Sequence, residues 1–153
     1  MPAEGGQAVF AAVSEIVRLL EADSTTDWSK VNLEALRQHL MDMDHVALRS
    51  RVAATWVPGG EMWAVRGTGA TVGAIRRMTA AHAAMMGMDN TIRIARRELP
   101  DGVLLTVTAA DPKDAALVAK IRALDFIGFM ASGTHHQMHH LMLARGVLGG
   151  HGH

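Results

Sequence analysis

The order of hydrophobic and polar residues predicts two helices at the start of the chain. Apolar residues recur every three or four positions over about 7–22, as on one face of an amphipathic helix. A polar break follows, and Asn32 is a good N-cap for a second helix that carries a stripe of leucines. We therefore expect residues 1–27 to form the first helix and its linker.

From residue 46 the period changes to two, which is typical of a half-buried strand. The turn Val57-Pro58-Gly59-Gly60 interrupts this alternation and predicts a β-hairpin, and a helix follows the hairpin. The turn Leu99-Pro100-Asp101-Gly102 predicts a second hairpin with a second helical region behind it. The expected strands cover 46–56, 61–67, 91–99 and 103–107, and the expected helices cover 71–86 and about 112–145, the latter with a kink at Gly128 or Gly133.

The two turns start 42 positions apart, at Val57 and Leu99, and their flanking strands align. This spacing predicts an internal ββα duplication, with units over 46–88 and 91–145. The expected fold is α+β, with a four-stranded, mostly antiparallel sheet that has its helices packed on one face. We expect a single domain over 1–153 that ends in a flexible Gly/His tail at 146–153.

Composition narrows the possible partners. The chain has 153 residues, of which 49% are hydrophobic, and 15 Lys and Arg residues balance 15 Asp and Glu residues. This neutral balance gives no field that would attract nucleic acid or an anionic membrane surface, so neither is expected as a partner. The short, duplicated layout suits a homodimer.

Neither a signal peptide nor a transmembrane span is expected, because Glu15 and Arg18 interrupt the apolar run near the N-terminus. The sequence as written predicts a cytoplasmic protein. A periplasmic location is the alternative if a leader peptide has been removed.

The absence of cysteine limits the possible metal chemistry. A chain without Cys has no disulfides, thiolate zinc fingers, Cys-ligated iron–sulfur clusters or covalent c-type haem. The remaining imidazole, carboxylate and thioether ligands suit transition metals such as copper, zinc or nickel.

Four of the nine histidines fall within six positions. On a helix, His135 and His139 share one face, and His136 and His140 share another. Two imidazoles at this spacing can bind one ion at about 2.0–2.1 Å. The four rings span an arc of roughly 140°, so they cannot all reach one ion from an ideal helix. The alternative is a His-rich polar face or a subunit contact without metal.

The residue types beside these histidines favour binding over hydrolysis. In the zincin motif a glutamate follows the first histidine and acts as the general base, but His136 and Gln137 stand at the corresponding positions here. We therefore expect metal binding rather than zincin-type catalysis, and no catalytic residue is predicted.

His82 is a candidate third imidazole from the helix that follows the first hairpin. The thioethers of Met86, Met138 and Met142 are secondary candidates, although methionines at helical spacing are also ordinary core residues. His45 is explained by its place near a helix end.

These patterns predict a transition-metal-binding protein for metal carriage, storage or sensing, with copper favoured and zinc or nickel next. One alternative is an enzyme that binds non-covalent haem or a non-haem metal through the same histidines. Another is a metal-free dimeric interaction module.

Overall fold

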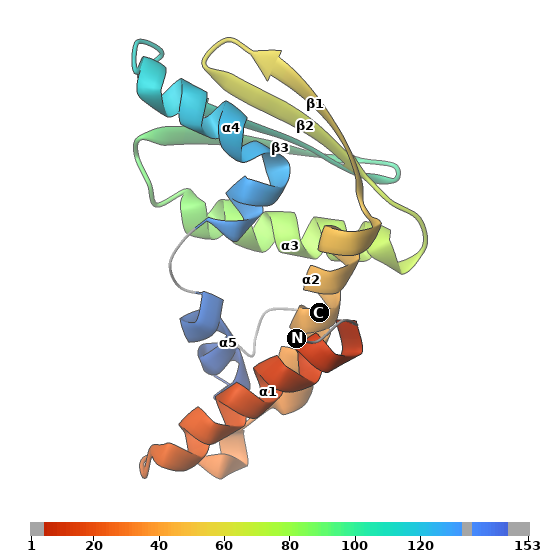
Figure 1. Cartoon of the computed structure of the whole chain (residues 1–153), viewed down its shortest axis with the longest axis vertical. Coiled ribbons are helices and arrows are strands. Elements are labelled where there is room, and N and C mark those ends of the chain that lie inside the picture. Colours follow the sequence, from red (N-terminus) through yellow and green to blue (C-terminus); the bar gives the residue numbers. More distant parts are fainter. Residues whose placement is uncertain (1–4, 133–135, 147–153) are drawn as a thin grey trace. The chain divides into compact units, whose positions relative to one another are not determined.

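The computed structural model describes residues 5–132 and 136–146, which form two compact units (Figure 1). A helical unit consists of residues 1–41 and 134–153, and a sheet unit consists of residues 42–133. The division into two compact units does not test the expectation of a single domain over 1–153, which stays a prediction.

The α+β class is confirmed, with five α-helices and one four-stranded antiparallel sheet in the described residues. The two hairpins are each followed by a helix, in the predicted order, but their origin by duplication stays a prediction. Among the residues that the structure describes, no helix is long and apolar enough to cross a membrane. The helices are α1 (Gly5–Ala22), the 3-10 helix η1 (Trp28–Lys30), α2 (Leu33–Arg49), α3 (Ala70–Met86), α4 (Ala115–Ala131) and α5 (His136–Ala144), and the strands are β1 (Arg51–Val57), β2 (Gly60–Arg66), β3 (Ile92–Leu99) and β4 (Gly102–Ala109).

The helical unit packs around aliphatic side chains from α1, the first part of α2, and α5. The predicted N-cap is confirmed, because the Asn32 side-chain oxygen accepts from the backbone N–H of Ala35 at 3.0 Å. Gly146 ends α5 as expected, with a φ of 81° that favours glycine. The buried core of this unit comprises Ile16, Leu20, Leu36, Leu40, Leu143 and Ala144.

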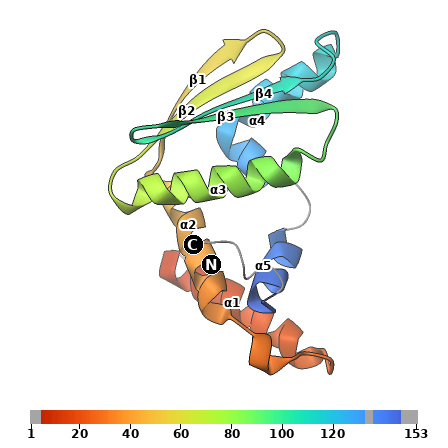
Figure 2. The same ribbon diagram turned by 180° about the vertical axis from the view of Figure 1, so that it is seen from behind.

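The sheet unit has the strand order β1-β2-β4-β3, with every pair antiparallel. Alternate residues of the two central strands are buried on one face, among them Trp63 and Leu105. Helices α3 and α4 cover this face, as predicted, and α4 contributes Phe126 and Phe129 to the same core. In Figure 2 the strands lie in front of α4, so the view is from the side of the sheet that α4 does not cover.

The predicted start of the first strand at Val46 is wrong. Helix α2 continues to Arg49, and β1 begins at Arg51. Val46 is buried in the core of the sheet unit, whereas Leu48 is 71% exposed on the same helix. Because apolar and polar residues happen to alternate over this last turn of α2, the pattern resembles a strand.

The predicted kink also lies elsewhere. Helix α4 bends at Asp125, which has φ 57° and ψ −171°, while Gly128 stays helical. A Cβ at Gly128 would lie 2.9 Å from Cβ of Leu124, so this glycine serves close packing. Gly133 lies outside the described residues. The helix also starts later than expected, at Ala115, where the Asp114 side chain accepts from Leu117 N.

Gly102 is one of the positions at which the sheet has no room for a side chain, because a Cβ there would collide with the carbonyl oxygen of Val65 on β2. We expect Gly102→Ala to lower the free energy of unfolding by about 2 kcal/mol or more, since the central strand pair must separate. Urea unfolding followed by circular dichroism measures the change. Gly73→Ala is the matched control: its Cβ meets only the flexible end of Arg77, and alanine raises helix propensity by about 1 kcal/mol. Equal midpoints for the two variants would contradict this account.

Candidate functional site

The His-rich segment belongs to the helical unit and lies on α5. His135 falls outside the described residues, as do the side chains of His136, Met138 and His139. The backbone of α5 begins at position 136, so positions 136 and 140 stand one helical turn apart, which is the predicted spacing. His140 is described and half-buried.

His140 lies against a histidine that the sequence analysis did not single out. The ring centroids of His39, on α2, and His140 are 5.2 Å apart, with an interplanar angle of 66°. Two imidazoles bound to one tetrahedral ion would have centroids about 5 Å apart, given metal–nitrogen distances of about 2.0–2.1 Å. The observed separation therefore suits a shared ion as well as an edge-to-face ring pair.

Two contacts hold α5 in place near this pair. The backbone N–H of Asn32 donates to the carbonyl of Ala144 at 2.6 Å. Arg145 donates to the Asp23 carboxylate at 2.7 Å, with both side chains about one-third exposed. These contacts tie the C-terminal end of α5, which follows His140, to the segment between α1 and α2.

The described side chains do not complete a metal site. No group of three His, Asp or Glu side chains with metal-binding geometry occurs among the residues that the structure describes. His39 and His140 thus provide two imidazoles. Of the other predicted ligands, Met142 is partly exposed on α5.

His82 belongs to the sheet unit and makes a buried contact there. Its Nε2 donates to the carbonyl oxygen of Phe129 at 2.7 Å, and its ring meets the Phe129 ring edge-on at 4.9 Å between centroids. This contact joins α3 to α4. Met86 packs against the same core. Metal ligation by His82 or Met86 stays a prediction.

His45 lies in the sheet unit as well, although it is on the same helix as His39. Its Nδ1 is 2.9 Å from Oγ1 of Thr71, at the start of α3. One turn earlier, the Asp42 carboxylate accepts two hydrogen bonds from Arg77, each of 2.8 Å. Both contacts fasten α2 to α3, which gives His45 a structural role.

A second group of polar residues lies under α4, around a buried carboxyl group. Glu61 on β2 is 3% exposed, and its Oε1 accepts a hydrogen bond of 2.5 Å from the indole N–H of Trp63. Burial raises the pKa of Glu61, and the nearby Asp125 carboxyl raises it further, against the lowering effect of hydrogen bonds from Trp63 and Trp56. Glu61 therefore favours its protonated form.

The kink of α4 brings Asp125 to this buried carboxyl group. Its backbone adopts a conformation that is rare outside glycine and costs on the order of 1–3 kcal/mol. One turn before it, Arg122 donates to the carbonyls of Val57 and Gly60 at 2.9 and 3.0 Å, and its guanidinium lies 4.4 Å from the centroid of the Trp56 ring. Arg122 thus fixes the β1–β2 turn to α4 on one side of the two carboxyl groups.

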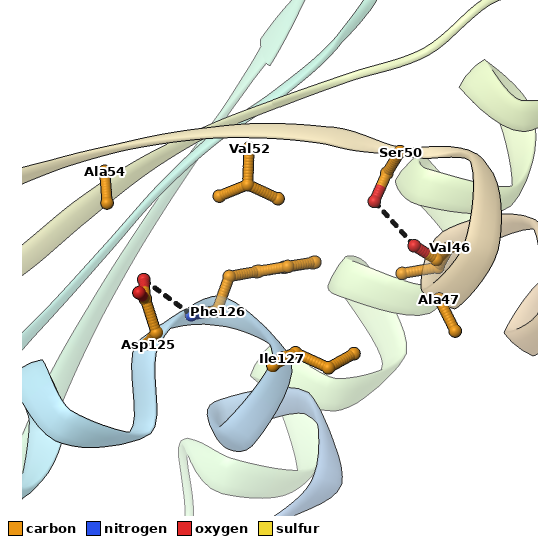
Figure 3. A pocket seen from close by; sticks show the side chains of 8 residues that line it. All are labelled: Val46, Ala47, Ser50, Val52, Ala54, Asp125, Phe126 and Ile127. Atoms are coloured by element: carbon orange, nitrogen blue, oxygen red, sulfur yellow. Dashed lines mark hydrogen bonds between the residues drawn. The ribbon is translucent and has the colours of Figure 1, made fainter.

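A cleft opens between β1 and α4, and Asp125 lies at its edge (Figure 3). The volume of the cleft is about 350 Å³. Val52 and Ala54 point into it from β1, opposite Phe126. The lining is apolar apart from Ser50 and Asp125, and it comprises Val46, Ala47, Ser50, Val52, Ala54, Asp125, Phe126 and Ile127.

No model of a known protein family, no curated protein and no solved structure matches this chain. The assignment of function therefore depends on its own residues and their geometry.

The buried carboxyl of Glu61 predicts a pH dependence of stability. Its ordinary pKa is 4.5 and its pKa in the folded state is higher, so the folded state keeps a proton that the unfolded chain loses. The free energy of unfolding should fall as pH rises from 4.5 through the folded-state pKa, and Glu61→Gln should remove this part of the dependence. Urea unfolding of both proteins at a series of pH values measures it.

Glu98→Gln is the control, since it removes a carboxyl that is 56% exposed from the same sheet. Its profile should run parallel to that of the unmodified protein. A Glu61→Gln profile that also runs parallel would show that Glu61 ionises alike in the folded and unfolded states.

Proposed function

We propose that this protein binds a transition-metal ion in its helical unit, with copper favoured and zinc or nickel next. The observation that carries the proposal is the separation of 5.2 Å between the rings of His39 and His140, which suits two imidazoles on one ion. His136 is the proposed third ligand, because its position stands one turn before His140 on the same face of α5. His135 and His139 are candidate ligands for a second ion, or for the same ion while it is being taken up or released.

The choice of metal follows from the ligand types. Imidazole nitrogens bind copper, zinc and nickel, and affinity generally peaks at copper among divalent ions of the first transition row. Met138 and Met142 would add thioether ligands one turn apart, which suit Cu(I). Carboxylate-rich sites for calcium or magnesium have a different composition.

The proposed role is carriage, storage or sensing of the metal. His39 and His140 are half-buried rather than enclosed, although Nε2 of His140 is itself shielded from solvent. A site of this kind, partly open at the protein surface, suits an ion that must be taken up and released.

The expected homodimer is also a proposal. The surface that favours self-association is the edge strand β1, which belongs to the sheet unit, whereas the proposed metal ligands belong to the helical unit. Metal binding and self-association can therefore be tested independently.

Substitution of the histidine pair tests the proposed ligands. We expect His39→Ala and His140→Ala each to raise the Kd for Cu²⁺ or Zn²⁺ by about tenfold or more, because each removes one ligand, and tenfold corresponds to about 1.4 kcal/mol. The measurement is competition with a chromophoric chelator, on protein purified without a histidine tag. Circular dichroism of the metal-free variants checks that the helical content of the chain is retained.

His45→Ala is the matched control, since it removes a histidine from α2 outside the helical unit, and its Kd should stay within about twofold. A variant with His135, His136, His139 and His140 all changed to alanine should lose most of the bound metal. Full metal stoichiometry in that variant would overturn the proposal. A Soret band in the purified protein would instead identify haem as the group that these histidines bind.

A further inference from the structure

Strand β1 is an edge of the sheet that lacks the usual protection against pairing with another strand. Within the sheet of the described residues, β2 is its one hydrogen-bonded neighbour. Residues 52–57 contain no charge and no proline, and their register with β2 is continuous. The other edge, β3, carries exposed Arg93 and Arg97, which would repel a second copy of themselves.

The hydrogen-bonding pattern of β1 fits an antiparallel partner of the same sequence. Val57 and Gly60 close the two-residue turn, so the N–H and C=O groups of Val52, Ala54 and Trp56 point away from β2. When two such strands meet with Ala54 opposite Ala54, Val52 of each lies opposite Trp56 of the other. All outward-pointing groups then find partners, and β-branched and aromatic residues pair across the strands.

The side chains beside β1 complement each other in the same arrangement. Trp56 is 69% exposed, although it is a large apolar residue. The cleft under Val52 and Ala54 is apolar, and Ile127 at its rim is 57% exposed (Figure 3). With Trp56 of a second copy opposite Val52, the exposed part of its indole comes to lie against this cleft while its N–H stays on Glu61 of its own copy, and the two-fold axis repeats the contact.

Charge favours this register as well. Arg122 lies against Trp56, and Asp125 lines the cleft below Ala54, the residue on which the pairing is centred (Figure 3). Pairing Trp56 with Val52 of a second copy therefore brings the guanidinium of one copy toward the carboxylate of the other. A second copy of the chain is thus the partner whose shape, hydrogen bonds and charge the surface fits.

We propose that this protein forms a homodimer through antiparallel pairing of β1 with β1 of a second copy, centred on Ala54, with Trp56 of each copy against the cleft of the other. The two four-stranded sheets join into one of eight strands. The interface gives the homodimer considered above a specific surface, and it requires no metal.

A single cysteine tests the register, because the chain contains none. Opposed Cα atoms in a hydrogen-bonded antiparallel pair lie about 5.5 Å apart, within the range of about 4.4–6.8 Å that disulfides span. Mild oxidation of Ala54→Cys should therefore give a covalent dimer. Val52→Cys is the control on the same strand: its two Cα atoms would be offset by about 13 Å along the strands, at 3.3 Å per residue, so it should stay uncrosslinked.

Sedimentation velocity of the full chain, with chelator present, tests the dimer itself. We expect a species of twice the 16.4 kDa chain mass at micromolar to submillimolar concentrations. Ala54→Lys and Val52→Lys should each raise the dimer Kd by about a hundredfold or more. The first places two like charges directly opposite each other, and the second places a charge where Trp56 of the other copy packs. Ala95→Lys, on the other edge strand, should leave it unchanged. Circular dichroism shows which variants remain folded.

A monomer throughout the concentration range would overturn the proposal, and so would equal crosslinking of Ala54→Cys and Val52→Cys. A dimer that Ala95→Lys disrupts and Val52→Lys does not would place the interface on β3 instead. Because chelator is present, these outcomes are independent of whether the histidines bind metal.

Discussion

The buried indole N–H of Trp63 needs a hydrogen-bond partner, and much of the arrangement of the sheet unit depends on that need. Trp63 is fully enclosed between the sheet and its helices, so its N–H must have a partner inside the core. Glu61, two residues earlier on the same face of β2, accepts that hydrogen bond, and a carboxyl group is thereby drawn into the core. Asp125 pairs with the carboxyl, and α4 bends into a strained conformation that carries Asp125 there. Burial of Phe126 and Phe129 around Trp63 offsets that strain.

Most of the fold could be predicted from local patterns. Both hairpins follow from alternating residues around turns that contain proline and glycine, and these turns depend on short-range sterics. The errors at Val46 and Asp125 arose where tertiary packing overrides local preference. Alternation at the end of α2 resembled a strand, and a positive φ at an aspartate becomes tolerable only with the core that forms around it.

The candidate metal site was only partly predictable. Spacing alone indicated the pairs on α5, because helical geometry places residues four apart on one face. His39 is 101 positions from His140, and no local pattern connects them. Its position just before Leu40 of the leucine stripe was the one available signal. Glu61 was missed because a single glutamate at the start of a strand normally faces solvent.

The chain order of the two units has a consequence for synthesis. The sheet unit is a continuous segment, so all of its strands and both covering helices are synthesised before α5. The helical unit joins segments from the two ends, and its contacts between Asn32 and Ala144 and between Asp23 and Arg145 close long loops. Helix α1 and the first turns of α2 are therefore synthesised well before α5, whose Leu143 and Ala144 complete their core. The contact between His39 and His140 can therefore form only after α5 has been synthesised.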